Sequence, residues 1–245
     1  MESAPLRAAA RGTTPTDQAR AAPAVARRPN LYAIVHKALR ACLADALLAS
    51  GRTDPDDDGE IAHLSTRVRL LGTLYRLHAA KEDQFIHPAM EARRSGSSRR
   101  TAADHVEHAR ALDRLDADIQ ALEAASGSAR SEATQTLYAD LALFAADDLV
   151  HMHAEEVENN AVLWACYTDA ELARIERELV ASIPLTEKVA FIGWMASACS
   201  PSERAILLGG VRAGAPPAAF ERMLASIKPR LSDTEWGKLA LALAA

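Results

Sequence analysis

The sequence has few of the residues that build sheets, disulfide frameworks or disordered segments. Aromatic residues make up 4% of the 245 residues, and glycine and proline number 11 each, which disfavours an all-β or a disordered chain. No stretch approaches the ~20 apolar residues of a membrane span. The three cysteines are odd in number, far apart and without a CxxC spacing, which predicts buried, reduced thiols rather than disulfides; they are Cys42, Cys166 and Cys199.

The sequence also lacks a strong charge of either sign. Its net charge is −5, and acidic and basic residues are interspersed, so we expect neither a nucleic-acid partner nor a membrane partner. Residues 1–29 are rich in Ala, Arg, Pro and Thr and lack the apolar run of a signal peptide. We expect them to form a flexible tail on a cytoplasmic protein. An Arg-rich, acid-poor leader of this kind also fits an organelle transit peptide.

The residues that dominate are alanine, leucine, arginine and glutamate, which are strong helix formers. With 49% apolar residues, the chain is long enough for one substantial core and an appended subdomain. The sequence therefore predicts an all-α fold, with an up-down four-helix bundle over residues 30–167 and a C-terminal helical extension over residues 168–245. From capping residues and apolar periodicity, we expect the first, second and fourth bundle helices at about 31–50, 60–92 and 131–164. The third follows the loop at 95–98 and ends at about residue 125.

Two of these helices repeat one pattern, a histidine followed four residues later by a glutamate. The pairs are His78 with Glu82 and His151 with Glu155. Residues four apart on a helix share a face and lie about 6 Å apart between Cβ atoms. Leucines and aromatic residues group around the same faces, so each helix is predicted to direct one imidazole and one carboxylate into the core.

The other two bundle helices each supply histidines to the same core. His36 lies within about 60° of three leucines at 100° per residue. On the third helix His108 falls on the centre line of the leucine stripe and is the preferred candidate, while His105 is about 60° away and is the second. Both bind if the site takes two nitrogens from this helix. The same arithmetic places His87 and His153 outside the core.

Several buried polar groups in one apolar core must be satisfied, and a cation does so most simply. Nitrogen and carboxylate donors without a thiolate suit iron, manganese or zinc. Because the two His–Glu pairs are near-symmetric, the pattern predicts a two-metal centre bridged by Glu82 and Glu155. The predicted metal ligands are His36, His78, Glu82, His105, His108, His151 and Glu155.

Taken together, these motifs resemble those of the hemerythrin-like, HHE cation-binding family of four-helix bundles. The resemblance covers about residues 30–166 and rests on the order of the histidines, the two HxxxE pairs and the Ile86-His-Pro88 ending of the second helix. It implies a non-haem di-iron site with oxo or hydroxo and carboxylate bridges and an open position for O2 or another small ligand. The chain departs from the family in Asn160, where a proline is common, and in the three-residue spacing of His105 and His108.

The resemblance implies a protein that binds or senses O2, NO or peroxide, or handles iron, and we expect this rather than an enzyme. A di-iron oxidase or nitric oxide reductase is the alternative within the same site chemistry. A helical regulatory module with a vestigial site is another. The segment 168–245 has no histidine, so we expect its short apolar helices to pack on the bundle, on a second copy in a homodimer, or on a protein partner.

Overall fold

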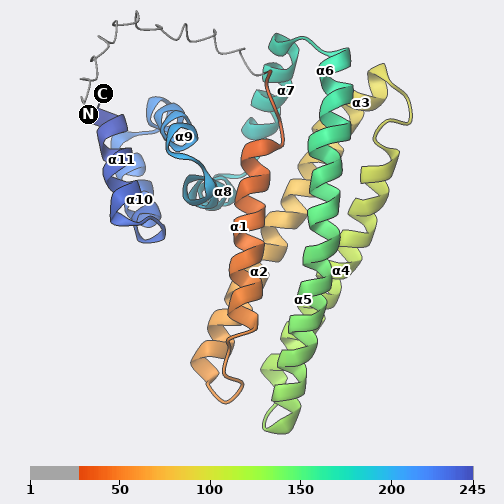
Figure 1. The fold of residues 1–245 in the computed structure, drawn as a ribbon, viewed down its shortest axis with the longest axis vertical. Helices are drawn as coiled ribbons and strands as arrows, with labels where there is room; N and C mark the ends of the chain where they lie inside the picture. The colour runs from red at the N-terminus through yellow and green to blue at the C-terminus, as the bar shows by residue number, and fades with distance from the viewer. Residues whose placement is uncertain (1–27, 245) are drawn as a thin grey trace, which may run out of the picture.

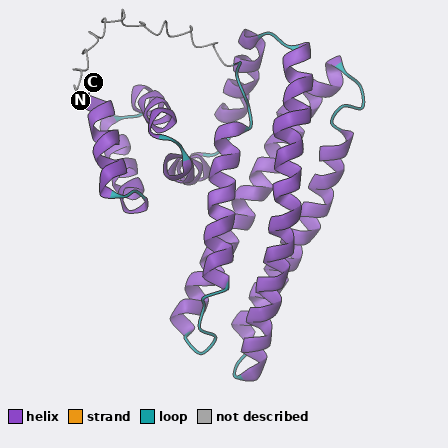
Figure 2. Cartoon of the chain, viewed as in Figure 1, coloured by secondary structure: helices purple, strands orange, loops and turns teal. Residues whose placement is uncertain are grey.

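The computed structural model describes residues 28–244, and the chain within this range contains helices and loops and no strand (Figures 1 and 2). Four long helices run alternately up and down and form the bundle on the right of Figure 1. The predicted all-α, four-helix architecture is therefore confirmed. The long helices are α1 (Ala33–Ser50), α2 (Asp58–Lys81), α4 (Arg99–Ala124) and α5 (Ser128–Ala154).

Side-chain caps and one glycine define where the bundle helices begin. The Asn30 side chain accepts hydrogen bonds from the backbone N–H groups of Tyr32 and Ala33, each at 3.0 Å, as an N-cap does. The Asp57 carboxylate caps α2 in the same way. Between α4 and α5, Gly127 has a φ of +55°, a conformation that glycine adopts without steric cost. The chain therefore reverses direction sharply there.

The bundle core consists of side chains that recur on one face of each long helix. Leu39 of α1, Leu71 of α2, Ile119 of α4 and Leu141 of α5 are all 0% exposed. Their burial follows from the 3–4 spacing of apolar residues that the sequence shows along each helix. This apolar layer continues up to a group of buried histidines and glutamates.

The second and fourth bundle helices are each interrupted by one π turn. The first, η1 (Glu82–Ile86), joins α2 to α3 (His87–Arg93), and the second, η2 (Glu155–Asn159), joins α5 to α6 (Asn160–Cys166). Each π turn begins at the glutamate of a His–Glu pair. A π turn holds one extra residue, so every residue beyond it is rotated relative to an unbroken α-helix.

This rotation explains why one sequence-based prediction is wrong. His87 was expected outside the core from its nine-residue distance to His78 on a regular α-helix, but it is only 5% exposed. The extra residue in η1 lies between the two histidines and turns His87 inward. His153 precedes η2 and is exposed, so its predicted position is confirmed.

Five further helices follow the bundle. Two of them begin with capping boxes, at Thr168–Glu171 and Ser200–Glu203. Helix α8 packs against α1 and is seen nearly end-on in Figure 1, and α9 to α11 lie beyond it. Residues 1–27 of the expected N-terminal tail lie outside the described residues. Pro29 is held on the bundle, because its carbonyl accepts a hydrogen bond from Trp164 Nε1 at 2.8 Å. The helices are α7 (Asp169–Ala181), α8 (Leu185–Ala198), α9 (Pro201–Gly214), α10 (Pro217–Ile227), the 3-10 turn η3 (Lys228–Arg230) and α11 (Asp233–Ala244).

We expect the contact between α8 and α1 to contribute strongly to stability. Phe191 is 5% exposed and belongs to the same apolar cluster as Leu39, so Phe191→Ala should lower the free energy of unfolding by about 3 kcal/mol. Leu185 lies on the same helix but is 76% exposed, and Leu185→Ala should change it by less than about 0.5 kcal/mol. Urea unfolding of both variants measures the difference. Equal effects would show that α8 is not part of the bundle core.

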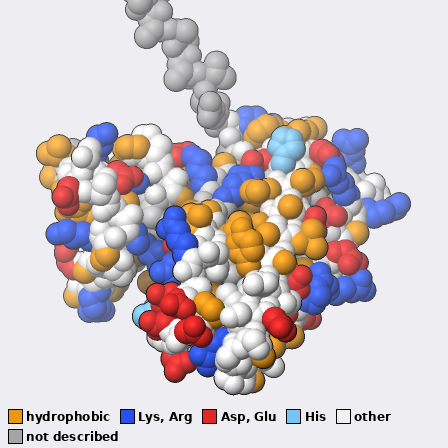
Figure 3. Space-filling model, turned by 60° about the horizontal axis from the view of Figure 1, so that its bottom comes forward, with side chains coloured by type: hydrophobic (Ala, Val, Ile, Leu, Met, Phe, Trp, Pro, Cys, Tyr) orange, Lys and Arg blue, Asp and Glu red, His pale blue; other side chains and the backbone are white. Residues whose placement is uncertain are grey.

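Acidic and basic side chains alternate over the face of the molecule shown in Figure 3, although acidic groups gather at its lower left. Within residues 28–244, no single helix is long and apolar enough to cross a membrane. Helices α7 and α8 together have the length and apolar composition of a membrane span, but the chain bends by 120° between them.

Candidate metal centre

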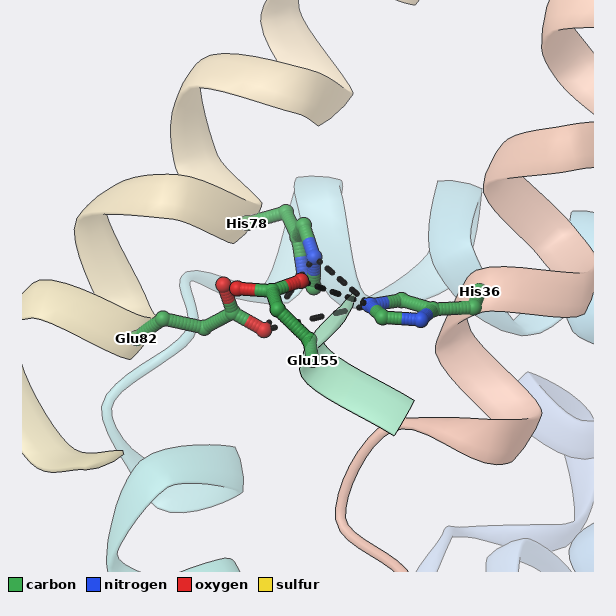
Figure 4. A group of neighbouring side chains, drawn as sticks. All are labelled: His36, His78, Glu82 and Glu155. Carbon is green, nitrogen blue, oxygen red and sulfur yellow. Dashed lines mark hydrogen bonds and ion pairs between the residues drawn. The ribbon is translucent and has the colours of Figure 1, made fainter. Parts of the chain in front are cut away.

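Side chains from all four bundle helices meet in one buried cluster above the apolar core. His36 comes from α1, His78 from α2, His105 from α4 and His151 from α5, and the two π turns contribute their first residues, Glu82 and Glu155. The side chains of the six residues are between 0% and 9% exposed. In Figure 4 the rings of His36 and His78 and the carboxylates of Glu82 and Glu155 point toward one another.

The first half of the cluster lies on the side of α1 and α2. His36 Nε2 is 3.2 Å from His78 Nε2 and 3.4 Å from Glu155 Oε2. His78 Nε2 is 3.3 Å from Glu82 Oε1. The four donor atoms lie within 4.8 Å of one another. This half therefore offers two imidazole nitrogens and two carboxylate oxygens to one ion.

The second half lies on the side of α4 and α5 and uses the same two carboxylates. His105 Nε2 is 3.2 Å from Glu82 Oε2 and 3.6 Å from Glu155 Oε1. His151 Nε2 is 3.3 Å from Glu155 Oε1. These four residues also meet within 4.8 Å. Glu82 and Glu155 thus belong to both halves, each with one oxygen directed toward each half.

The oxygens shared by the two halves fit a pair of cations. Within the described part of the chain, both carboxylate oxygens of Glu82, both of Glu155 and Nε2 of His105 are buried without a hydrogen-bond partner. Burying such groups unpaired costs about 2 kcal/mol or more each. Two imidazole and two carboxylate donors per half, without a thiolate, are a donor set that iron, manganese or zinc accepts.

Three carboxylates outside the cluster orient its histidines. Asp83 Oδ1 accepts from His105 Nδ1 at 2.8 Å, and Glu156 Oε1 lies 3.0 Å from His36 Nδ1. Asp104 Oδ2 lies 3.3 Å from Nδ1 of the fourth-helix histidine, His151. A carboxylate on Nδ1 fixes the ring with Nε2 free to bind a metal, an arrangement typical of metal-bound histidines.

Burial and ion pairing set the charges of the metal-free cluster. Burial raises the pKa of Glu82 to about 8, and the neighbouring Glu155 carboxylate adds to this rise. Burial alone would lower the pKa of His36 and His105, but the carboxylates beside each ring outweigh it and raise these pKa values to about 9 and about 11. Burial also opposes ionisation of Glu155, but the three histidines beside it hold its pKa well below its usual range.

We therefore expect metal loading to release protons. At pH 7, Glu82, His36 and His105 hold protons in the metal-free protein, because pH 7 lies below all three pKa values. A metal takes only the deprotonated forms, so binding should expel these protons and weaken as the pH falls. Calorimetry of anaerobic iron(II) binding at pH 7, in two buffers of different ionisation enthalpy, measures the number released. Identical heats in both buffers would contradict the charge pattern.

The structure reverses the expected order of the two histidines on α4. His105 lies inside the cluster, whereas His108 is half-buried and packs edge-on against His151 and Phe144, with ring centroids 4.7 and 5.7 Å apart. Among residues 28–244, His108 belongs to none of the groups whose donor atoms could share a metal. The buried residues of α4 are Thr101, His105, Leu112, Leu115, Ile119 and Leu122, so His108 is less buried than its place on the leucine stripe predicts.

Several buried polar residues near the cluster were not foreseen. Asn159 Nδ2 donates to the Tyr32 hydroxyl and to Thr101 Oγ1, at 3.3 and 3.2 Å. Thr101 Oγ1 lies 3.1 Å from His87 Nε2, and His87 Nδ1 lies 2.9 Å from Asp83 Oδ1. Helical periodicity could not have revealed this series of hydrogen bonds, because the positions of His87 and Asn159 depend on the π turns.

The two aspartates one turn before His151 lie in different environments. Asp148 is 2% exposed and accepts from the Tyr75 hydroxyl at 2.9 Å. Asp147 is exposed. Asp148 therefore bonds to a tyrosine beside the cluster rather than to a candidate metal ligand.

Comparison with known proteins gives one family and one relative. The family described as "Hemerythrin HHE cation binding domain" matches residues 31–162. "Zinc finger protein BRUTUS-like" from Arabidopsis thaliana is 24% identical over 178 residues, which are 71% of this chain. The chain spans only 14% of that protein's length. No solved structure matches.

Proposed function

The chain belongs to the hemerythrin HHE cation-binding family, and we propose that its bundle holds two iron ions and binds a small ligand such as O2 or NO beside them. The observation that carries this proposal is that Glu82 and Glu155 belong to both halves of the cluster, with no hydrogen-bond partner for their four carboxylate oxygens among the described residues. Two histidines on each side complete two donor sets. A single ion would leave one of the two sets unused.

The residues of the centre have separate tasks in this proposal. His36 and His78 would hold one ion, His105 and His151 the other, and the two glutamates would be shared. Each ion then has four protein donors, which leaves room for another ligand because iron readily takes more than four. The bound ions supply reversible redox chemistry and a site for the small ligand. The outer carboxylates keep the imidazole rings in place while the ligand enters and leaves.

Metal analysis tests this function. The purified full chain, loaded anaerobically with iron(II), should hold two irons per chain, and manganese and zinc serve as competing metals. The absorption spectrum is then followed during exposure to air and during return to anaerobic conditions. A reversible change supports ligand binding or sensing, whereas continued consumption of O2 or NO supports an oxidase or reductase. One iron or none per chain would overturn the two-metal proposal.

A further inference from the structure

A cavity of about 520 Å3 lies beside the metal centre, between α2, α4 and α5. Three of the four candidate nitrogen ligands, His78, His105 and His151, are in its wall. Another flank of the centre is filled by Tyr32 and Asn159, which are 0% and 2% exposed and hydrogen-bonded to each other. A ligand larger than a few atoms therefore reaches the centre from the side of the cavity.

The cavity is larger than a diatomic ligand requires. One water molecule takes up ~30 Å3 in the liquid, and O2 and NO are of similar size, so either would occupy a small fraction of the space. Pockets of roughly 300–1,000 Å3 hold organic ligands. The space exists because short side chains line it, including Ala79, Ala102 and Ala109.

The polar groups of the wall include Tyr75, His108 and Asp148, and the charged side chains of Arg76, Arg110 and Asp113 also line it. The Tyr75 hydroxyl donates to Asp148 at 2.9 Å, and both residues are buried. His108 also lines the cavity, and no hydrogen bond to its imidazole is found within residues 28–244. Asp148 accepts hydrogen bonds, while the Tyr75 oxygen and the two ring nitrogens of a neutral His108 can between them donate and accept. A hydroxyl group, which does both, fits this end of the cavity, and the alanines and Leu112 suit an apolar body.

We propose that the cavity binds a small aromatic hydroxyl compound, of the phenol class, with its oxygen toward the metal centre. The proposal rests on the proposed function in that it names the ligand class of the same site. A flat ring fits between helices lined with alanine, and a phenol oxygen is a hard donor that suits iron. His108 is then a ligand-contacting residue, which explains a core-facing histidine that lies outside the metal-binding groups.

Calorimetric titration with phenol tests the proposal on the full chain, in both its iron-loaded and metal-free forms. Phenol should bind saturably, and toluene, which replaces the hydroxyl with a methyl group, should bind at least tenfold more weakly. His108→Phe keeps the ring packing and removes the hydrogen-bonding nitrogens, so it should weaken phenol binding about three- to tenfold and leave toluene unaffected. Equal affinity for phenol and toluene would overturn the recognition of the hydroxyl.

A matched pair on α4 tests whether the cavity is the binding site. Ala102 lines the cavity, whereas its neighbour Ala103 is exposed and does not. Ala102→Leu should weaken phenol binding more than tenfold, and Ala103→Leu should not change it. If Ala102→Leu fails to fold, Ala109→Leu replaces it as the test, because Ala109 lies two turns further along α4 and lines the same cavity.

The two proposals fail in different ways. If two irons load but phenol does not bind, the inference is wrong and the proposed function stands. If iron does not load but the metal-free chain binds phenol at Ala102 and His108, the metal proposal is wrong and the cavity assignment stands. Equal phenol binding by the Ala102→Leu and Ala103→Leu proteins would place the ligand elsewhere.

Discussion

The Glu155→Gln protein is expected to bind at most one iron per chain, compared with two in the unchanged protein. Glu155 is 0% exposed and faces both halves of the cluster. The amide has nearly the same shape but carries no charge, so it cannot neutralise two cations held close together. Charge repulsion in a poorly screened interior is large, and the second ion should therefore be lost. Iron analysis after anaerobic loading measures this.

Glu158→Gln provides the matched control, because Glu158 lies in the same π turn but is exposed and pairs with Arg100. It should load two irons. Circular dichroism of both variants should show unchanged helicity, since neither substitution removes a backbone hydrogen bond. Two irons in the Glu155→Gln protein would show that Glu155 does not bridge.

His105→Ala and His108→Ala are expected to have very different effects, although the two residues are three apart on one helix. His105 supplies Nε2 to the second half of the cluster and is fixed by Asp83. Its loss should leave that half with one nitrogen and reduce iron to about one per chain. His108 lies outside the cluster, so His108→Ala should retain two irons.

The same iron analysis, together with the absorption spectrum, decides between these histidines. If His108→Ala loses iron and His105→Ala keeps it, the ligand on α4 is the one that regular helical periodicity favours. That result would require α4 to be rotated by about 60° about its axis. Loss of iron in both variants would mean that both histidines bind, which the distances do not favour.

Helical periodicity predicts the orientation of most of the cluster. His36, His78 and His151 lie near leucine stripes, and each glutamate is one turn beyond its histidine, so placing them inward requires only local geometry. The bundle itself follows from four amphipathic segments with clear caps. These features depend on residues close together in the sequence.

The remaining features depend on geometry that a regular helix does not contain. The π turns at Glu82 and Glu155 rotate everything beyond them, so His87 and Asn159 could not be placed by counting 100° per residue. The choice of His105 over His108 depends on the contacts of His105 with Glu82, Asp83 and Glu155, which belong to other helices. The contacts of Asp83 and Asp104 with histidines on other helices depend on how helices pair, which periodicity within one helix does not determine.

The central claim is that Glu82 and Glu155 are shared by two ions. X-ray absorption at the iron edge of the anaerobically loaded full chain tests it most directly, because this measurement detects a second iron near the first. The claim predicts nitrogen and oxygen donors around each iron and an iron neighbour at a bridging distance, of about 3.5–4 Å in two-metal sites. A spectrum with these donors but without an iron neighbour would contradict it.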